Sequence, residues 1–241
     1  STINLIAHYD FEDLGATSST TVNILPAYAD SLADGYPNPN GNNLCDGNSV
    51  SGYTVGGGRL FSSITNLNNA GSDCFMWFQD YDISGLPSAT ITDVVYNFGG
   101  DSSVTNTYYK GTTPYNNIHY VPLESVRANA PVADVFSQLK GVASADYFVS
   151  DSSVGHQTDV VQNLDLGTNA DTSLTDAIAN GDTYWGFGSV HAYNNGDPFD
   201  ANQIYGWYIA SGYNIDVSYD TVANAETLDN HADFVDTYLD E

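Results

Sequence analysis

The sequence predicts an all-β protein, a jelly-roll-type antiparallel β-sandwich with one short helix near residues 171–180. Short apolar segments recur along the chain between clusters of Gly, Asn, Asp and Pro, as they do in antiparallel sheets. Of the 30 acidic residues four are Glu and the other 26 are Asp, and Asp favours turns and caps over helix interiors. No series of strands alternating with long helices indicates βαβ units, so a parallel sheet is not expected.

The predicted strands differ in how clearly their pattern shows. Residues 213–219 alternate strictly, with Ile215, Val217 and Tyr219 on one face, which is typical of a half-buried strand. Residues 74–82 are almost continuously apolar. Further strands are expected at residues 3–11, 89–98, 118–123, 143–149, 158–166, 183–193 and 203–210. Residues 28–58 are rich in turn-forming residues, and we expect a long surface loop there.

The best helix candidate is residues 171–180. Asp171 or Ser173 could cap its start, Leu174, Ala177 and Ile178 form one apolar face, and the Asn180-Gly181 pair predicts its end.

The length of 241 residues suits one large sandwich, which we expect to span residues 1–221. A strand within residues 1–12 could pair in its own sheet or be exchanged with a neighbouring chain. Residues 222–241 are expected to form an acidic tail after the last strand.

The net charge is −26, with only four Lys and Arg residues. Such a surface repels nucleic acid phosphates and anionic lipids, so neither is an expected partner. No apolar run approaches the roughly 20 residues of a membrane span, which argues against membrane insertion. We expect Cys45 and Cys74 to form a disulfide, as in a secreted protein; the alternative is two buried thiols. We expect the protein to be secreted and to act outside the cell or at its surface.

Three segments resemble one known family. These are FMWFQDYDISGLPSATITDVVYNF, whose turn is Asp82, Ser84, Leu86 and Pro87, then LDLGTNADTSLTDAIANGDTYWGFG and YIASGYNIDVSYD. Over residues 55–220 the chain resembles the DNRLRE-type modules, which are carbohydrate-binding-like jelly-roll sandwiches of secreted prokaryotic proteins. The DNRLRE signature itself is absent, and the opening LIAHYDFED looks instead like the first strand of laminin-G-like sandwiches. The resemblance therefore implies a fold and secretion but transfers no ligand-binding residue.

Exposed aromatic side chains beside Asx residues are typical of sugar-binding surfaces. Candidates for a glycan site are Tyr193, Tyr205, Trp207 and Tyr208. The alternative is that aromatic residues belong to the core, which we expect for Trp77 and Trp185 because their neighbours are apolar or glycine.

Calcium binds loop carboxylates, amides and backbone carbonyls. Two Asx-rich segments offer such ligands, and the candidates are Asp30, Asp34, Asn195, Asp197 and Asp200. The alternative is that these side chains bond their own backbone in turns.

No spacing of acids, histidines or nucleophiles defines a catalytic site, so no catalytic residue is assigned and an enzyme is not expected. The expected function is a non-catalytic extracellular structural or adhesive module, such as a subunit of a surface layer or filament assembled by strand addition. Its partner would be itself or an extracellular glycan. The alternatives are a carbohydrate-binding module and, last, a polysaccharide hydrolase or lyase.

Overall fold

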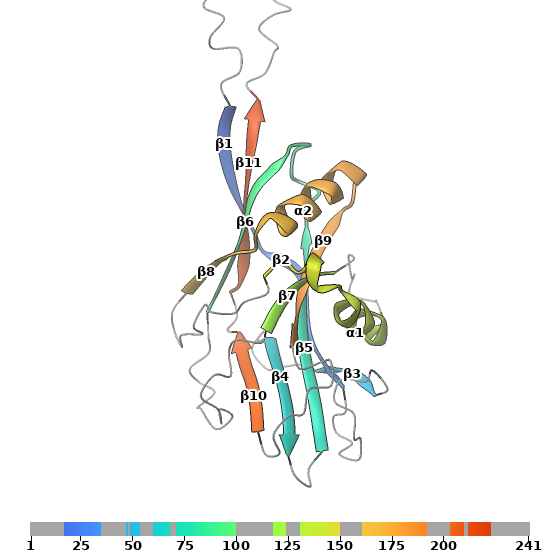
Figure 1. The fold of residues 1–241 in the computed structure, drawn as a ribbon. Helices are drawn as coiled ribbons and strands as arrows, with labels where there is room; N and C mark the ends of the chain where they lie inside the picture. Colours follow the sequence, from blue (N-terminus) through green and yellow to red (C-terminus); the bar gives the residue numbers. More distant parts are fainter. Residues whose placement is uncertain are drawn as a thin grey trace, which may run out of the picture.

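The computed structural model of the chain describes residues 17–34, 47, 49–53, 60–67, 71–99, 118–123, 131–149, 161–191, 203–209 and 212–222, arranged as Figure 1 shows. The strands in this part of the chain are β1 (Thr17–Ile24), β2 (Pro26–Asp34), β3 (Val50–Tyr53), β4 (Leu60–Leu67), β5 (Gly71–Asp82), β6 (Ile91–Gly99), β7 (Ile118–Leu123), β8 (Val161–Asp165), β9 (Tyr184–His191), β10 (Gln203–Ile209) and β11 (Asn214–Val222). The helices are α1 (Val132–Gly141), the 3-10 helix η2 (Ser144–Asp146) and α2 (Thr168–Asn180).

The strands form two antiparallel sheets, so the prediction of a mainly antiparallel β protein is confirmed. The first sheet has four strands in the order β1-β11-β6-β8, and we call it sheet A. The second has seven, which we call sheet B; its path is β10-β4-β5-β2-β3, and β9 joins β5 to β7. Strand β5 is the hub of sheet B, because it pairs with β2, β4 and β9.

The two sheets share one core that is rich in aromatic side chains. Trp77 of sheet B lies 5.9 Å from Tyr96 of sheet A between ring centroids, and Tyr96 lies 5.1 Å from Phe187 of β9. Ile215 and Val217 of β11 are fully buried in the same cluster. Burial of this many rings supplies most of the driving force for packing the sheets together.

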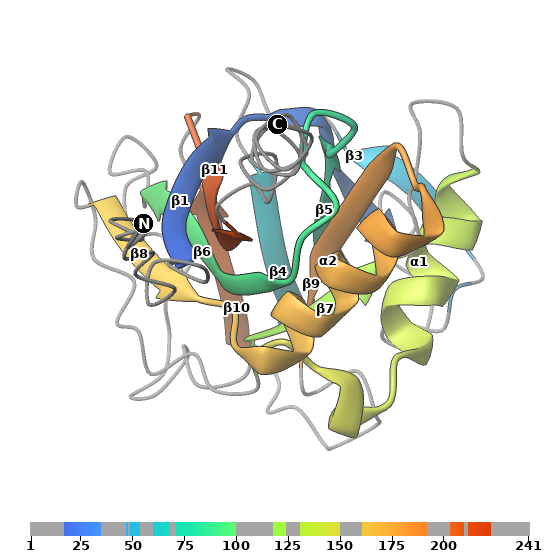
Figure 2. The same cartoon turned by 90° about the horizontal axis from the view of Figure 1, so that it is seen from above.

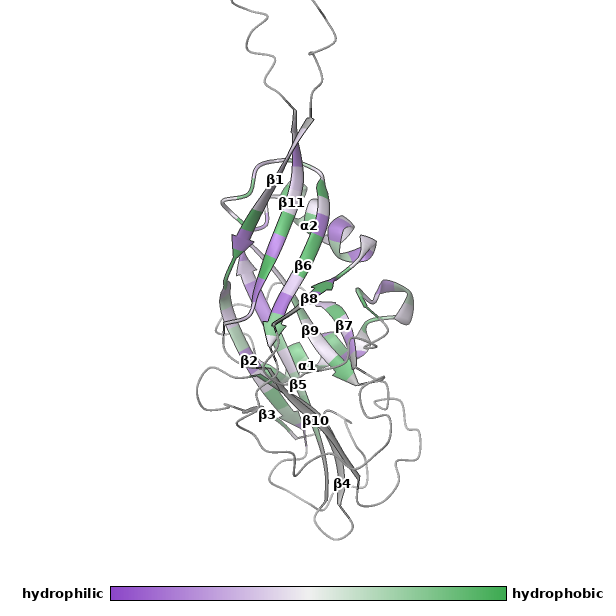
Figure 3. Cartoon of the chain, turned by 90° about the vertical axis from the view of Figure 1, so that its left-hand side faces the viewer, coloured by the Kyte–Doolittle hydropathy of each residue, from purple (hydrophilic) through white to green (hydrophobic). Residues whose placement is uncertain are grey.

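The outer face of sheet A is polar. The Asn23 and Asn97 side-chain amides each donate to Asn214 Oδ1 and to a carboxylate oxygen of Asp216, at 2.7–2.8 Å. These four side chains tie β1, β11 and β6 together across the exposed surface. Alternating hydrophilic and hydrophobic residues along β6 and β11 are visible in Figure 3.

Helix α1 covers part of the outer face of sheet B. Val135, Phe136 and Leu139 of this helix are buried against Met76 and Phe78 of β5. The helix can approach closely because Gly188 has no side chain: a Cβ there would stand 2.6 Å from Leu139 Cδ2 and 2.6 Å from the Trp77 carbonyl oxygen. Around β5, β7 and β9 sheet B is therefore buried on both faces, and Figure 2 shows α1 and α2 on the same side of the molecule.

The predicted helix exists and is longer than expected, since α2 begins at Thr168. Its N-cap is Gly167, so the prediction that Asp171 or Ser173 caps it was wrong. Gly181 ends the helix in the left-handed conformation, with φ of 75°, which glycine adopts without a steric penalty. The predicted Asn180-Gly181 stop is therefore confirmed.

Two further predictions were wrong. Residues 28–58 do not form one long loop, because Pro26–Asp34 is a strand between β5 and β3. The small residues of this strand suit its position beside β5. Ser31 lies opposite Trp77, and its short side chain leaves room for the indole ring. Residues 143–149 form η2 followed by a single bridge from Val149 to Tyr120 instead of a strand.

A second helix was also missed, so the expectation of one short helix was wrong. Its signal is present in the sequence, because Val132, Val135, Phe136 and Leu139 follow Pro131 at helical spacing. The predicted strand in residues 1–12 and the tail from residue 223 lie outside the described residues. No helix within the described ranges is long and apolar enough to cross a membrane.

Candidate ligand-binding groove

A groove of about 720 Å³ lies between α2 and three segments that face it, two from sheet B and one from the η2 region. Four stretches of chain line it: β7's end, the η2 region, α2, and the start of β9. The lining residues are Pro122, Leu123, Asp146, Phe148, Asn169, Thr172, Ser173, Asp176, Ala177, Asn180, Asp182, Tyr184 and Trp185. This volume falls in the range of small-molecule sites in proteins.

Helix α2 presents one polar face to the groove. Its lining residues are Asn169, Thr172, Ser173, Asp176 and Asn180, together with Ala177. They recur every three or four positions, which places them along one side of an α-helix. The core side of the same helix carries Ala170 and Leu174. Packing of that apolar side fixes which polar residues line the groove.

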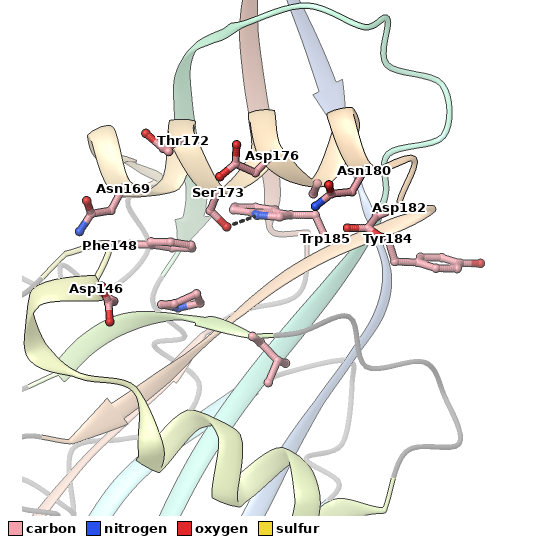
Figure 4. Close-up of a pocket in the computed structure, with 13 residues that line it drawn as sticks. Asp146, Phe148, Asn169, Thr172, Ser173, Asp176, Asn180, Asp182, Tyr184 and Trp185 are labelled. Atoms are coloured by element: carbon pink, nitrogen blue, oxygen red, sulfur yellow. Dashed lines mark hydrogen bonds between the residues drawn. The ribbon is translucent and has the colours of Figure 1, made fainter.

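Two stacked aromatic rings form the floor. Phe148 and Trp185 have centroids 5.6 Å apart and an interplanar angle of 14°. The Trp185 indole Nε1 donates to Ser173 Oγ at 3.0 Å, which fixes the ring beneath α2, as Figure 4 shows. The rings are mostly buried, at 8% and 4% exposure, so only a small part of either ring borders the groove.

One end of the groove is held together by Asn169. Its side-chain amide donates to the carbonyl oxygens of Ala145 and Tyr147, each at 3.0 Å. The bonds join the first turn of α2 to the η2 region across the groove. The two walls are therefore fixed relative to each other by protein contacts, as a preformed site requires.

The rim is acidic. Asp146 comes from η2, Asp176 from α2, and Asp182 from the residues after α2 (Figure 4). Among the described residues that line the groove there is no Lys, Arg, His or Cys. The remaining polar groups are hydroxyls and amides. The lining therefore offers hydrogen-bond acceptors with negative charge and several neutral donors.

A second acidic cluster lies outside the groove, where β6 meets the first turn of α2. Burial, and then the charge of Asp165, raises the pKa of Asp93 above its usual range. Burial, followed by the charges of Asp93 and Asp165, raises the pKa of Asp171. Asp171 Oδ1 is buried without a hydrogen-bond partner. Within the described ranges no group of three or more His, Cys, Asp or Glu residues has a geometry that could hold a metal ion.

Two of the five predicted calcium ligands lie within the described residues. Asp30 and Asp34 lie on β2 and not in a loop. Asp34 is 2% exposed, and its two carboxylate oxygens accept the backbone N–H groups of Gly47 and Ser49 at 2.7 and 3.1 Å. Asn195, Asp197 and Asp200 lie outside the described residues. Calcium binding stays a prediction.

Three of the four predicted glycan residues lie on a described strand that contributes nothing to the groove lining. Tyr205, Trp207 and Tyr208 are on β10, which pairs with β4 at the end of the sheet B path. Tyr193 lies outside the described residues. The expected core positions of Trp77 and Trp185 are confirmed, since both are buried. Cys74 on β5 is disulfide-bonded, and Cys45, the other cysteine, lies outside the described residues.

The groove could not be read from the sequence, because its lining comes from four separated stretches. The available signal was the polar side of α2, where Asn169, Thr172, Asp176 and Asn180 repeat at helical spacing.

The comparisons with protein-family models and with curated protein sequences give no match. The class is therefore defined by architecture alone: two packed antiparallel sheets, a helix over the outer face of one sheet, and an acid-rimmed groove under a second helix. The resemblance to DNRLRE-type modules stays a prediction.

Proposed function

We propose that this protein is a non-catalytic adhesive module that acts outside the cell by binding a glycan in the groove beneath α2. One observation carries the proposal: a groove of about 720 Å³ with an aromatic floor and a rim of hydroxyl, amide and carboxylate groups. Sugars present C–H faces that pack on aromatic rings, and hydroxyls that bond to amides and carboxylates.

The location outside the cell is supported by the disulfide at Cys74. Disulfides form and persist in oxidising environments such as the extracellular space and are rare in the cytosol. The net charge of −26 also keeps such a module soluble and away from anionic surfaces. The jelly-roll topology and a kinship with DNRLRE-type modules belong to the same proposal, and the two antiparallel sheets are compatible with both.

A glycan array tests the proposal with a groove-filling variant. Thr172 is exposed on α2 and lines the groove, so Thr172→Tyr should obstruct it without entering the core. Ser137→Tyr is the matched control, because Ser137 is exposed on α1. We expect the parent and Ser137→Tyr to bind the same glycans and Thr172→Tyr to lose at least about tenfold in affinity.

Two results would reject the proposal: an array without hits, or hits that Thr172→Tyr leaves unchanged. Release of shortened sugars from a bound glycan would contradict the non-catalytic part.

A second candidate function is a structural subunit that assembles by strand addition. The observation that favours it is the edge of sheet A. Strand β1 pairs on one side with β11, and its sequence TSSTTVNI has no Lys or Pro, the residues that commonly protect an edge. A strand from another chain could pair with the other side.

Electron microscopy and light scattering at high protein concentration, with and without Ca²⁺, test this second function. Filaments or layers would support assembly, and Ser19→Lys with Thr21→Lys on β1 should abolish them. A compact monomer under all of these conditions would rule it out.

A further inference from the structure

We propose that β1 is a self-association edge, which pairs antiparallel with β1 of a second copy of this chain across a two-fold axis. The two four-stranded sheets then become one continuous sheet. The inference rests on the second candidate function above, assembly by strand addition, and it names the partner of that edge and the symmetry of the contact. It follows from the position and charge of β1, from the exposure of its core-facing side chains, and from the register that a two-fold axis allows.

Strand β1 lies at the edge of sheet A. It is the first strand in the order β1-β11-β6-β8, and within the described ranges it pairs with β11 alone. Backbone N–H and C=O groups point alternately to the two sides of a strand, so about half of those in β1 are directed away from β11. Figure 2 shows β1 on the opposite side of the molecule from α1, so this helix does not cover the edge.

The edge strand is held in place by side-chain bonds to its neighbour. Ser18 Oγ and Thr221 Oγ1 are 2.6 Å apart, and Thr21 Oγ1 and Ser218 Oγ are 2.9 Å apart. The bonds from Asn23 to β11 lie further along the same strand. A partner therefore meets a strand whose conformation is already fixed, which lowers the entropic cost of pairing.

Strand β1 also lacks charge. Its sequence TSSTTVNI contains no Asp, Glu, Lys or Arg, although the net charge of the chain is −26. Two copies can therefore pair along this strand without like charges directly opposite each other, which would destabilise the ladder. The other edge of sheet A, β8, is five residues long and ends on Asp165. Within sheet A, β1 is thus the edge that suits pairing with a copy of itself.

The core-facing side chains of β1 are left partly uncovered. Val22 and Ile24 are half-buried against the shared core, whereas their cross-strand partners Val217 and Ile215 are fully buried. The difference arises because β11 has a described strand on each side and β1 has one. A strand added beyond β1 would cover the remaining apolar surface of Val22 and Ile24, which favours association.

A two-fold axis restricts the register of the contact. Directly opposite residues of an antiparallel pair share one face of the sheet, so even-numbered residues must oppose even-numbered ones for both cores to lie on the same side. A register with Thr21 on the axis meets this condition and keeps both apolar residues in the ladder. The other cross-strand pairs are then uncharged: Val22 with Thr20, Ile24 with Ser18, and Asn23 with Ser19. Such an isologous contact closes on itself, so association stops at the dimer.

Sedimentation equilibrium over a range of protein concentrations, at about 0.15 M and about 1 M NaCl, measures the association. We expect an equilibrium between monomer and dimer without larger species. The dimer should be tighter at the higher salt concentration, because salt screens the repulsion between two chains of charge −26. Amide hydrogen exchange locates the contact, since residues 18–24 should exchange more slowly at concentrations where the dimer predominates.

The variant is Thr21→Asp, which places two carboxylates side by side at the axis. Thr21→Asn is the matched control, because it has nearly the same shape and also loses the hydroxyl contact with Ser218, but adds no charge. Ser137→Asp adds the same charge at an exposed position of α1. We expect Thr21→Asp to weaken the dimer at least about tenfold and both controls to dimerise as the parent does. Equal thermal midpoints of the two Thr21 variants at low concentration confirm that they fold.

Each other outcome overturns the inference in a recognisable way. Filaments or layers would mean open, head-to-tail strand addition, which rejects the two-fold contact and leaves the second candidate function standing. A dimer whose slowed amides lie outside residues 18–24, or one that Thr21→Asp leaves unchanged, would reject β1 as the contact. Equal weakening by Ser137→Asp would assign the effect to overall charge. A monomer at every concentration and salt rejects the inference and the second candidate function together.

Discussion

The outer faces of the two sheets differ although both sheets are antiparallel. Sheet A turns side chains such as Asn97, Asn214 and Asp216 to its surface, where they bond one another. Sheet B turns Met76 and Phe78 outward, and α1 covers them. The same backbone pattern therefore supports a polar surface in one sheet and a second apolar core in the other.

The sequence pattern of each strand follows from this difference. Strand β11 alternates because only one of its faces is buried. Strand β5 reads CFMWFQDY from Cys74 to Tyr81, and every one of these residues is buried, because the shared core lies on one side and α1 on the other. A strand that is buried along its length needs a covering element on each face, and α1 is the one on the outer face.

The largest loss of stability is expected where α1 packs on sheet B. Phe136→Ala truncates a side chain that is 1% exposed between α1 and β5. We expect the free energy of unfolding to fall by about 3–5 kcal/mol in urea titrations followed by tryptophan fluorescence. Ser137→Ala, on the exposed side of the same helix, should change it by less than about 0.5 kcal/mol. A loss below about 1 kcal/mol for Phe136→Ala would mean that α1 is not anchored there.

The next largest loss of stability is expected at Gly188, where α1 approaches β9 closely. Gly188→Ala places a Cβ 2.6 Å from a backbone oxygen of Trp77 and from Leu139, so the strand or helix must shift. We expect a destabilisation of about 1–3 kcal/mol. Gly85→Ala is the control, because nothing lies within 4 Å of its Cβ position. Equal stabilities of the two variants in the same titration would show that the contact is relaxed.

A smaller effect is expected on the polar face of sheet A. Asn97→Ala removes two hydrogen bonds, to Asn214 and Asp216. The expected loss is about 0.5–1.5 kcal/mol in the free energy of unfolding, because water replaces part of what is removed. A loss as large as that of Phe136→Ala would overturn the contrast between the two faces.

The smallest change in stability is expected for the acids beside α2, and it depends on pH. The pKa of Asp93 is raised in the folded state, mainly by burial and then by Asp165, so the folded chain binds this proton more tightly than the unfolded chain. Its favourable contribution is complete below the unfolded pKa and is lost as the pH rises through the folded pKa. Asp93→Asn should therefore stabilise the protein at pH 7, by at most about 1 kcal/mol.

The same variant should also flatten the rise in thermal midpoint that accompanies acidification from neutral pH. A steeper dependence than in the parent protein would contradict the raised pKa of Asp93 in the folded state.

The sequence predicted the strands whose pattern comes from the shared core, such as β5, β6 and β11. It failed at β2, where Asp30, Asp34 and Pro26 have the composition of a turn, because that strand is specified by its pairing with β5. It also failed at α1, although Val135, Phe136 and Leu139 show the helical period. The groove was beyond sequence reasoning, since contacts such as Asn169 with Ala145 join stretches that no local pattern connects.

The pairing of β1 with β11 has a mechanical consequence. Thr17 at the start of β1 is opposite Val222 at the end of β11, and the two strand ends protrude side by side in Figure 1. Inter-strand hydrogen bonds run perpendicular to antiparallel strands, so tension that separates these two residues acts along the bonds and breaks them one after another. Peeling would start at this ribbon at low force and lengthen the chain one residue pair at a time.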